Sequence, residues 1–157
     1  MADYSGRLTD TGLSNPQVLD WDITINRVNR TATIHAIQYF YVTNGEVYSN
    51  YGEMTLGIEG DLHDYSVNWS GTATPSSGYV KMQEKTVVEN YNTDGTIANA
   101  CIFLNAVAHV QPLPNISNGH IKVNNVWKNA FAWMKILGVW KRCTIWMKIN
   151  GVWKRGK

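Results

Sequence analysis

The chain has 157 residues, of which 44% are hydrophobic and 17% are charged, and this suits one compact domain with an appendage better than two full domains. No stretch is long and apolar enough to span a membrane, and the first residues lack the basic and apolar regions of a signal peptide, so we expect synthesis and folding in a cytoplasm. The net charge of +2 conceals an asymmetry, because residues 1–94 carry a net −7 and residues 95–157 carry +9.

The first hundred residues have the pattern of β-strands. Apolar and polar residues alternate from Leu19 to Ile25, which predicts a half-buried strand with Asp20 and Asp22 on its outer face. Many short strands separated by Gly, Asn, Asp and Pro turns predict a β-sandwich or barrel over residues 1–110. The other expected strands cover residues 31–42, 54–58, 65–69, 79–82, 85–89 and 97–107.

Residues 111–119 separate this domain from a repeated segment. Their sequence, QPLPNISNG, contains two of the four prolines together with Asn and Ser, which is a composition typical of a linker. The repeated segment then covers residues 120–157. The sequence therefore predicts three parts, namely a β domain, a linker and a C-terminal β-repeat segment.

The segment 120–157 repeats with a period of thirteen residues. The unit reads IKVNNVWKN, then MKILGVWKR, then MKINGVWKR. Two-residue turns fit Asn124-Asn125, Leu137-Gly138 and Asn150-Gly151, since type I′ turns need positive φ at both central residues and favour Asn-Gly. Eleven residues lie between successive turns. Each repeat therefore predicts one long strand and one tight turn, and together they predict an antiparallel β-meander.

The tryptophans of the repeats share one face of the predicted strands, because side chains alternate along a strand. The turns set each of three tryptophans opposite a basic residue, and such a pair contributes about 0.5–1 kcal/mol at an exposed site. These pairs are Lys135–Trp140, Trp133–Arg142 and Lys148–Trp153. Five tryptophans on one bare face exceed the apolar patch usual on a monomer, so we expect a partner to cover them. The predicted interface or glycan-binding residues are Trp127, Trp133, Trp140, Trp146, Trp153, Lys135, Arg142, Lys148 and Arg155.

Two motifs resemble phage proteins. Residues 85–107, with a turn at 92–96 (NTDGT), resemble a pattern near the end of immunoglobulin-like domains in tail-associated proteins of phages of Gram-positive bacteria. The Trp repeats resemble the short NGVWK tails at the ends of phage and prophage structural proteins. The resemblance to phage tail-associated structural proteins implies an all-β fold, an immunoglobulin-like β-sandwich followed by the C-terminal antiparallel β-meander. It also implies a place in a virion, after synthesis in the host cytoplasm.

Catalytic motifs are not recognisable in the sequence. GxSxG, Walker-type and GxGxxG motifs do not occur, and the four histidines are scattered. Asp61 and His63 can share one strand face, but two ligands are too few for zinc, and we interpret them as part of an exposed polar face. The sequence therefore predicts a protein that is not an enzyme and that binds no metal or cofactor.

Two binding hypotheses remain. In the favoured one, the protein is a structural component of a phage tail, baseplate, fibre or capsid exterior, and the Trp-rich face packs against other virion proteins or further copies of the chain. The alternative is a carbohydrate or cell-wall-polymer binding module for host adsorption, whose partner is a host cell-surface glycan. Evenly repeated Lys-Trp pairs favour packing over a ligand site. Nucleic acid is not an expected partner, because the basic residues are spread along the strands among tryptophans.

Overall fold

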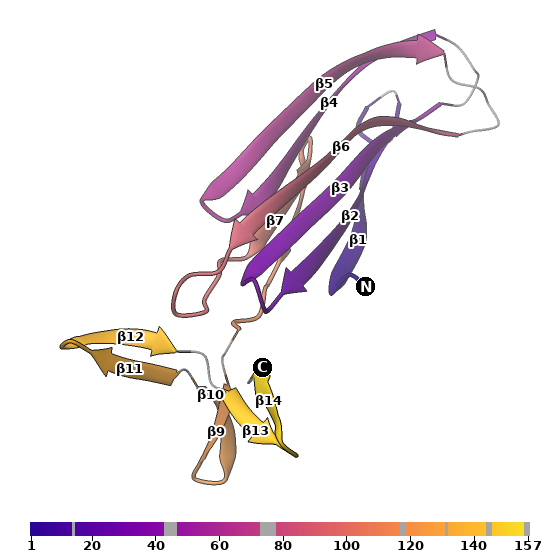
Figure 1. Ribbon diagram of the computed structural model, residues 1–157. Coiled ribbons are helices and arrows are strands. Elements are labelled where there is room, and N and C mark those ends of the chain that lie inside the picture. The colour runs from indigo at the N-terminus through magenta and orange to yellow at the C-terminus, as the bar shows by residue number, and fades with distance from the viewer. Residues whose placement is uncertain are drawn as a thin grey trace. The chain divides into compact units, whose positions relative to one another are not determined.

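The structure of the protein is a computed structural model that describes residues 1–13, 15–42, 47–72, 78–116, 119–130, 132–143 and 146–155. All strand pairs in these residues are antiparallel, and the predicted all-β class is confirmed (Figure 1). Over the same residues, no helix has the length and apolar character needed to cross a membrane. The chain divides into an N-terminal unit, residues 1–90 with 97–113, and a C-terminal unit, residues 91–96 with 114–157.

The N-terminal unit contains two four-stranded sheets (Figure 1). The first sheet has the order β1-β2-β3-β6, with strands Tyr4–Asp10, Gln17–Asn26, Thr31–Tyr41 and Tyr79–Asn90. The second has the order β5-β4-β7-β8, with strands Asp61–Thr72, Val47–Ile58, Ala100–Leu104 and Val107–Gln111. β6 is therefore one edge strand of the first sheet, and β5 is one edge strand of the second.

One apolar core is shared by the two sheets. Ile23 and Ile34 of the first sheet and Leu56 and Ile102 of the second are fully buried in the same cluster. The alternation predicted for β2 is confirmed, because its apolar residues from Leu19 onward are buried and the residues between them are more exposed. Burial of this alternating set fixes which face of each strand points inward.

The bounds of three predicted strands in the N-terminal unit are wrong. The strands expected at 79–82 and 85–89 form one continuous strand, β6. The single strand expected at 97–107 is instead β7 and β8, with a turn at Asn105, which has φ of 50°. Asn adopts this left-handed conformation more readily than most residues. Its amide also donates to Asp10 and accepts from the backbone N–H of Glu53, which holds the turn in place.

One strand was not expected from the sequence. β1 has only Leu8 buried, so it lacks the apolar alternation that reveals the other strands. It forms because its backbone pairs with β2 over its whole length, from Tyr4 opposite Ile23 to Asp10 opposite Gln17. Pairing with an existing edge is a tertiary effect that local residue preferences do not encode.

The C-terminal unit contains three hairpins, each a two-stranded antiparallel sheet (Figure 1). They pair β9 with β10, β11 with β12 and β13 with β14, formed by Gly119–Val123, Val126–Ala130, Ala132–Ile136, Val139–Cys143, Trp146–Ile149 and Val152–Arg155. The predicted turns are confirmed, because both central residues of each have positive φ, between 49° and 84°.

The continuous meander is not confirmed. Each eleven-residue segment that was expected to be one strand contributes, in the described residues, to two successive hairpins, as β10 and β11 do. Two-stranded ribbons twist more strongly than wide sheets, which favours separate hairpins over one flat sheet. One repeat therefore combines the second strand of one hairpin with the first strand of the next. The part boundaries predicted at 110 and 119 stay a prediction.

Candidate functional site

The hairpins bring each tryptophan of the repeats opposite a basic residue. The five pairs in register are Trp127–Lys122, Trp133–Arg142, Trp140–Lys135, Trp146–Arg155 and Trp153–Lys148. Three of them are the pairs predicted from the turns, which the structure confirms. The register follows from the two-residue turns, since the turn type and loop length of a hairpin fix which residues face each other.

The contact between Lys135 and Trp140 is weak. The ammonium nitrogen of Lys135 lies 6.0 Å from the centroid of the Trp140 ring, which is the outer limit of a cation–π contact. Such a contact contributes about 0.5 kcal/mol at an exposed site. An isolated two-stranded hairpin is at best marginally stable in water. A contact of this size is therefore too weak to stabilise a hairpin by itself.

Large apolar side chains are exposed on both faces of the β11–β12 and β13–β14 hairpins. The residues Trp133, Trp140, Trp146 and Trp153 have exposed fractions of 50%, 62%, 55% and 63%. On the opposite, apolar face the valines are exposed as well, as Val126, Val139 and Val152 show. The side chains of Trp127 and Arg155 lie outside the described residues. The predicted site residues thus occur on three two-stranded sheets, each with large apolar side chains in contact with solvent.

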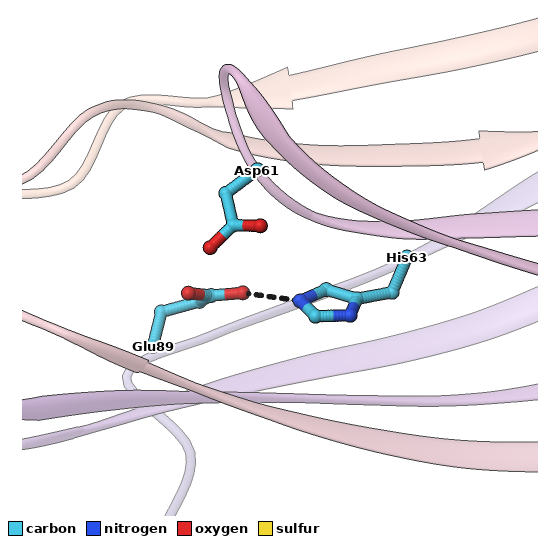
Figure 2. A group of neighbouring side chains, drawn as sticks. All are labelled: Asp61, His63 and Glu89. Atoms are coloured by element: carbon cyan, nitrogen blue, oxygen red, sulfur yellow. Dashed lines mark hydrogen bonds and ion pairs between the residues drawn. The ribbon is translucent and has the colours of Figure 1, made fainter.

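A second cluster lies in the N-terminal unit, where the outermost strands of the two sheets approach each other. Asp61 and His63 come from β5, and Glu89 comes from β6 (Figure 2). The Nε2 atom of His63 is 3.0 Å from Oε1 of Glu89, and one ligand atom from each of the three residues lies within 4.8 Å of the others. The interpretation of Asp61 and His63 as a plain polar face missed Glu89.

The sequence contains a partial signal for Glu89. It follows Val87 with the period of two that marks the inward face of β6, and this alternation places its carboxylate on the inward face. Which residues it meets depends on β5, a strand of the other sheet, and this cross-sheet approach is a long-range feature. The cluster therefore becomes visible only in the folded chain.

A third group of charged residues lies on the outer face of the first sheet. His35 on β3 is bonded through Nδ1 to Asp22 on β2, at 2.7 Å, and through Nε2 to Glu84 on β6, at 2.9 Å. The hydrogen bond to Asp22 and then that to Glu84 raise the pKa of His35. The pKa of Glu84 is lowered, first by its hydrogen bond with Lys81 and then by that with His35.

We expect this group to make stability depend on pH. Because the pKa of His35 is raised on folding, its contribution is fully present below the unfolded value of about 6.5 and is lost as pH rises through the folded pKa. The partners are half-exposed, so the effect is on the order of 1 kcal/mol or less. In urea denaturation, the stability difference between the native chain and His35→Gln should shrink from pH 6 to pH 8. A constant difference would contradict the assignment.

None of the protein-family models, curated proteins and solved structures compared with the chain matches it. Two features of the described residues are unusual for a β domain that acts alone. They are the uncovered Trp-rich hairpins and the mixed carboxylate–imidazole cluster at β5 and β6.

Proposed function

We propose that the protein is a non-enzymatic structural protein of a phage virion, located in the tail, baseplate, fibre or capsid exterior, and that it assembles through its C-terminal hairpins. The carrying observation is that each hairpin is a separate two-stranded sheet and that the β11–β12 and β13–β14 hairpins have exposed tryptophans. Two-stranded hairpins of this kind gain stability when another surface covers a face. Contact with other virion proteins or with further copies of the chain supplies that cover.

The charge distribution supports copies of the same chain as partners. Residues 1–94 carry a net −7, whereas residues 95–157 carry +9, and the hairpins lie in the basic part. Hairpins of two copies that met face to face would bring like charges together. A basic hairpin that meets an acidic surface of the next copy avoids this repulsion, and such head-to-tail contacts produce rings or stacks.

The strand pairing supports an immunoglobulin-like β-sandwich as the finer fold assignment. In the seven-stranded form of that fold, the second strand pairs with the fifth, the third with the sixth and the sixth with the seventh. If β1 is set aside as an addition, the corresponding pairs are β3–β6, β4–β7 and β7–β8. β5 differs from the constant-type arrangement, because it pairs with β4.

The alternative function is a carbohydrate or cell-wall-polymer binding module for host adsorption. The observation that favours it is the exposure of Trp140 and Trp153 beside Lys135 and Lys148. Flat aromatic rings offer apolar faces on which sugar rings can stack, and the neighbouring ammonium groups attract anionic polymers. This alternative predicts a monomer whose hairpins stay uncovered until glycan binds.

The assembly proposal predicts that the tryptophans hold the oligomer together. Sedimentation velocity of the full chain should show a species heavier than the 17.7 kDa monomer. Replacing Trp133, Trp140 and Trp153 together by threonine keeps β-forming residues but removes large apolar rings, so we expect mainly monomer. Tyr51→Thr is the matched control, because Tyr51 is a similarly exposed aromatic residue on β4.

Tryptophan fluorescence and salt distinguish the remaining possibilities. A full chain that is monomeric, with solvent-exposed Trp emission that shifts when cell-wall glycan is added, would contradict assembly and support the glycan module. An oligomer that dissociates in high salt would support the contact between acidic and basic parts, since exposed ion pairs are screened. If the variant with all three substitutions, Trp133→Thr, Trp140→Thr and Trp153→Thr, still forms the oligomer, the interface does not lie on the Trp-rich hairpins and the assembly proposal is wrong.

A further inference from the structure

We infer that Asp61, His63 and Glu89 form a binding site for a divalent transition-metal ion of the zinc type, which would fasten β5 to β6. The inference does not rest on the proposed function, because the three residues lie in the N-terminal unit and the Trp-rich hairpins in the other.

The ligand set selects a class of metal. One imidazole nitrogen and two carboxylate oxygens suit Zn²⁺ and its first-row neighbours, whereas Mg²⁺ and Ca²⁺ favour sites built entirely from oxygen. Three protein ligands leave a fourth tetrahedral position for water. His63 offers Nε2 toward Glu89, and Asp61 is two residues before His63 on the same strand, so both side chains lie on one face of β5.

The spacing is close to that of a bound metal. Tetrahedral ligands at about 2.1 Å from zinc are separated from one another by about 3.4 Å. The His63 nitrogen and the Glu89 oxygen are 3.0 Å apart, and no two of the three ligand atoms are more than 4.8 Å apart. Figure 2 shows the Asp61 carboxylate directed toward that of Glu89, with the His63 ring at the side. These separations lie within about 1.4 Å of the spacing that a tetrahedral site requires.

The burial of Glu89 is an independent observation that points to a cation. Its exposed fraction is 8%. Of the buried residues in the part of the chain that the structure describes, it is the only one with a charged side chain. A buried carboxylate is costly unless it is paired, and the nearby Asp61 carboxylate adds repulsion. The His63 side chain has an exposed fraction of 43%, and it is one imidazole beside two carboxylates. A divalent cation neutralises both carboxylates.

The position of the three residues between the two sheets means that a bound metal would stabilise the fold. β5 and β6 are outermost strands of different sheets and do not pair with each other. Nearby, the ammonium group of Lys85 on β6 lies 4.9 Å from the ring centroid of Tyr65 on β5, which is a weak cross-sheet contact. A metal ion bound by Asp61 and His63 of β5 and by Glu89 of β6 would connect the two strands. Its binding should therefore raise the unfolding temperature.

Isothermal titration calorimetry of the full, EDTA-treated chain with ZnCl₂ tests the inference. We expect one tight Zn²⁺ per chain and a rise in unfolding temperature, with no comparable binding of MgCl₂ or CaCl₂. Asp61→Asn and Glu89→Gln keep the side-chain shapes but remove a charged ligand, so each should weaken the affinity at least about tenfold. Asp64→Asn is the matched control on β5, because Asp64 accepts a hydrogen bond from Thr55 and is not one of the three ligands. His35→Gln controls for the other histidine with two carboxylate neighbours.

Zinc binding that is unchanged in both Asp61→Asn and Glu89→Gln would overturn the inference, as would a native chain that binds no zinc. Asp61 is exposed, so Asp61→Asn should remain folded and gives a result even if Glu89→Gln does not fold. Circular dichroism in EDTA checks the fold of each variant. The Trp133→Thr, Trp140→Thr, Trp153→Thr chain should bind zinc normally, so failure of the assembly proposal and failure of this one are distinguishable.

Discussion

Replacing Gly57 with alanine is expected to lower the free energy of unfolding by about 3 kcal/mol and the unfolding temperature by roughly 10 °C. Gly57 lies in β4 with φ of 153°, a conformation that L residues rarely adopt. A Cβ atom there would lie 2.3 Å from the carbonyl oxygen of Asp61 and 3.1 Å from the Cα of Leu62. Both are backbone atoms, so rotation of a side chain cannot relieve the clash, and the backbone of the β4–β5 hairpin must shift.

Gly60 provides the matched control for this prediction. It lies in the turn of the same hairpin and also has positive φ, 89°, but a Cβ atom there meets nothing within 4 Å. Gly60→Ala should therefore cost only about 1 kcal/mol, the penalty for the left-handed conformation. Urea denaturation of both variants compares the two costs directly. Equal losses of stability would show that the close approach of Asp61 to Gly57 is not the cause.

The hairpins of the repeats were predictable from the sequence because their determinants are local. Asn150-Gly151 is a strong type I′ turn signal, and two-residue turns fix the register of the residues beside them. The pairing of Lys148 with Trp153 follows from that turn alone, and the structure confirms it. The same rule gave the pairing of Lys135 with Trp140 across a Leu-Gly turn. How successive hairpins connect was not predictable, because it depends on the segments between them.

The cross-sheet features were not predictable because they join residues far apart in the chain. Asp61 and Glu89 are near each other only because β5 and β6 are outermost strands of two sheets with a common core. Residue preferences carry no information on this approach. The inward position of Gln38 could be read from its alternation with Ile34 and Phe40, but its hydrogen-bond partners could not.

The partners of Gln38 form a buried chain of amides. The Nε2 atom of Gln83 donates to Oε1 of Gln38, and the Nε2 atom of Gln38 donates to Oε1 of Gln17, both at 2.6 Å. Gln17 in turn donates to the carbonyl oxygen of Tyr51 in the second sheet, at 2.8 Å. Gly52 makes room for them, because a Cβ atom there would lie 2.4 Å from the Gln38 amide nitrogen. These hydrogen bonds between amides thus link strands β6, β3 and β2 to β4.

Gln38→Glu is expected to lower the free energy of unfolding at pH 7 by about 3–5 kcal/mol, because it places an unpaired charge among fully buried groups. The introduced carboxylate also turns an oxygen toward Oε1 of Gln17, where the native amide donates a hydrogen bond. Two acceptors then face each other. Gln111→Glu, at the half-buried end of β8, is the control and should change stability by no more than about 0.5 kcal/mol.

The pH dependence of Gln38→Glu tests whether the hydrogen-bonded chain is the reason for the loss. A protonated carboxyl has the shape of the amide, can donate to Gln17 and can accept from Gln83. Burial raises the pKa of the introduced carboxyl above its unfolded value of about 4.3. The loss relative to the native chain should therefore be small below pH 4.3, grow as pH rises toward the folded pKa and stay constant above it. Urea denaturation of both chains between pH 4 and 8 measures this difference, and a loss that does not vary with pH would instead indicate a packing defect.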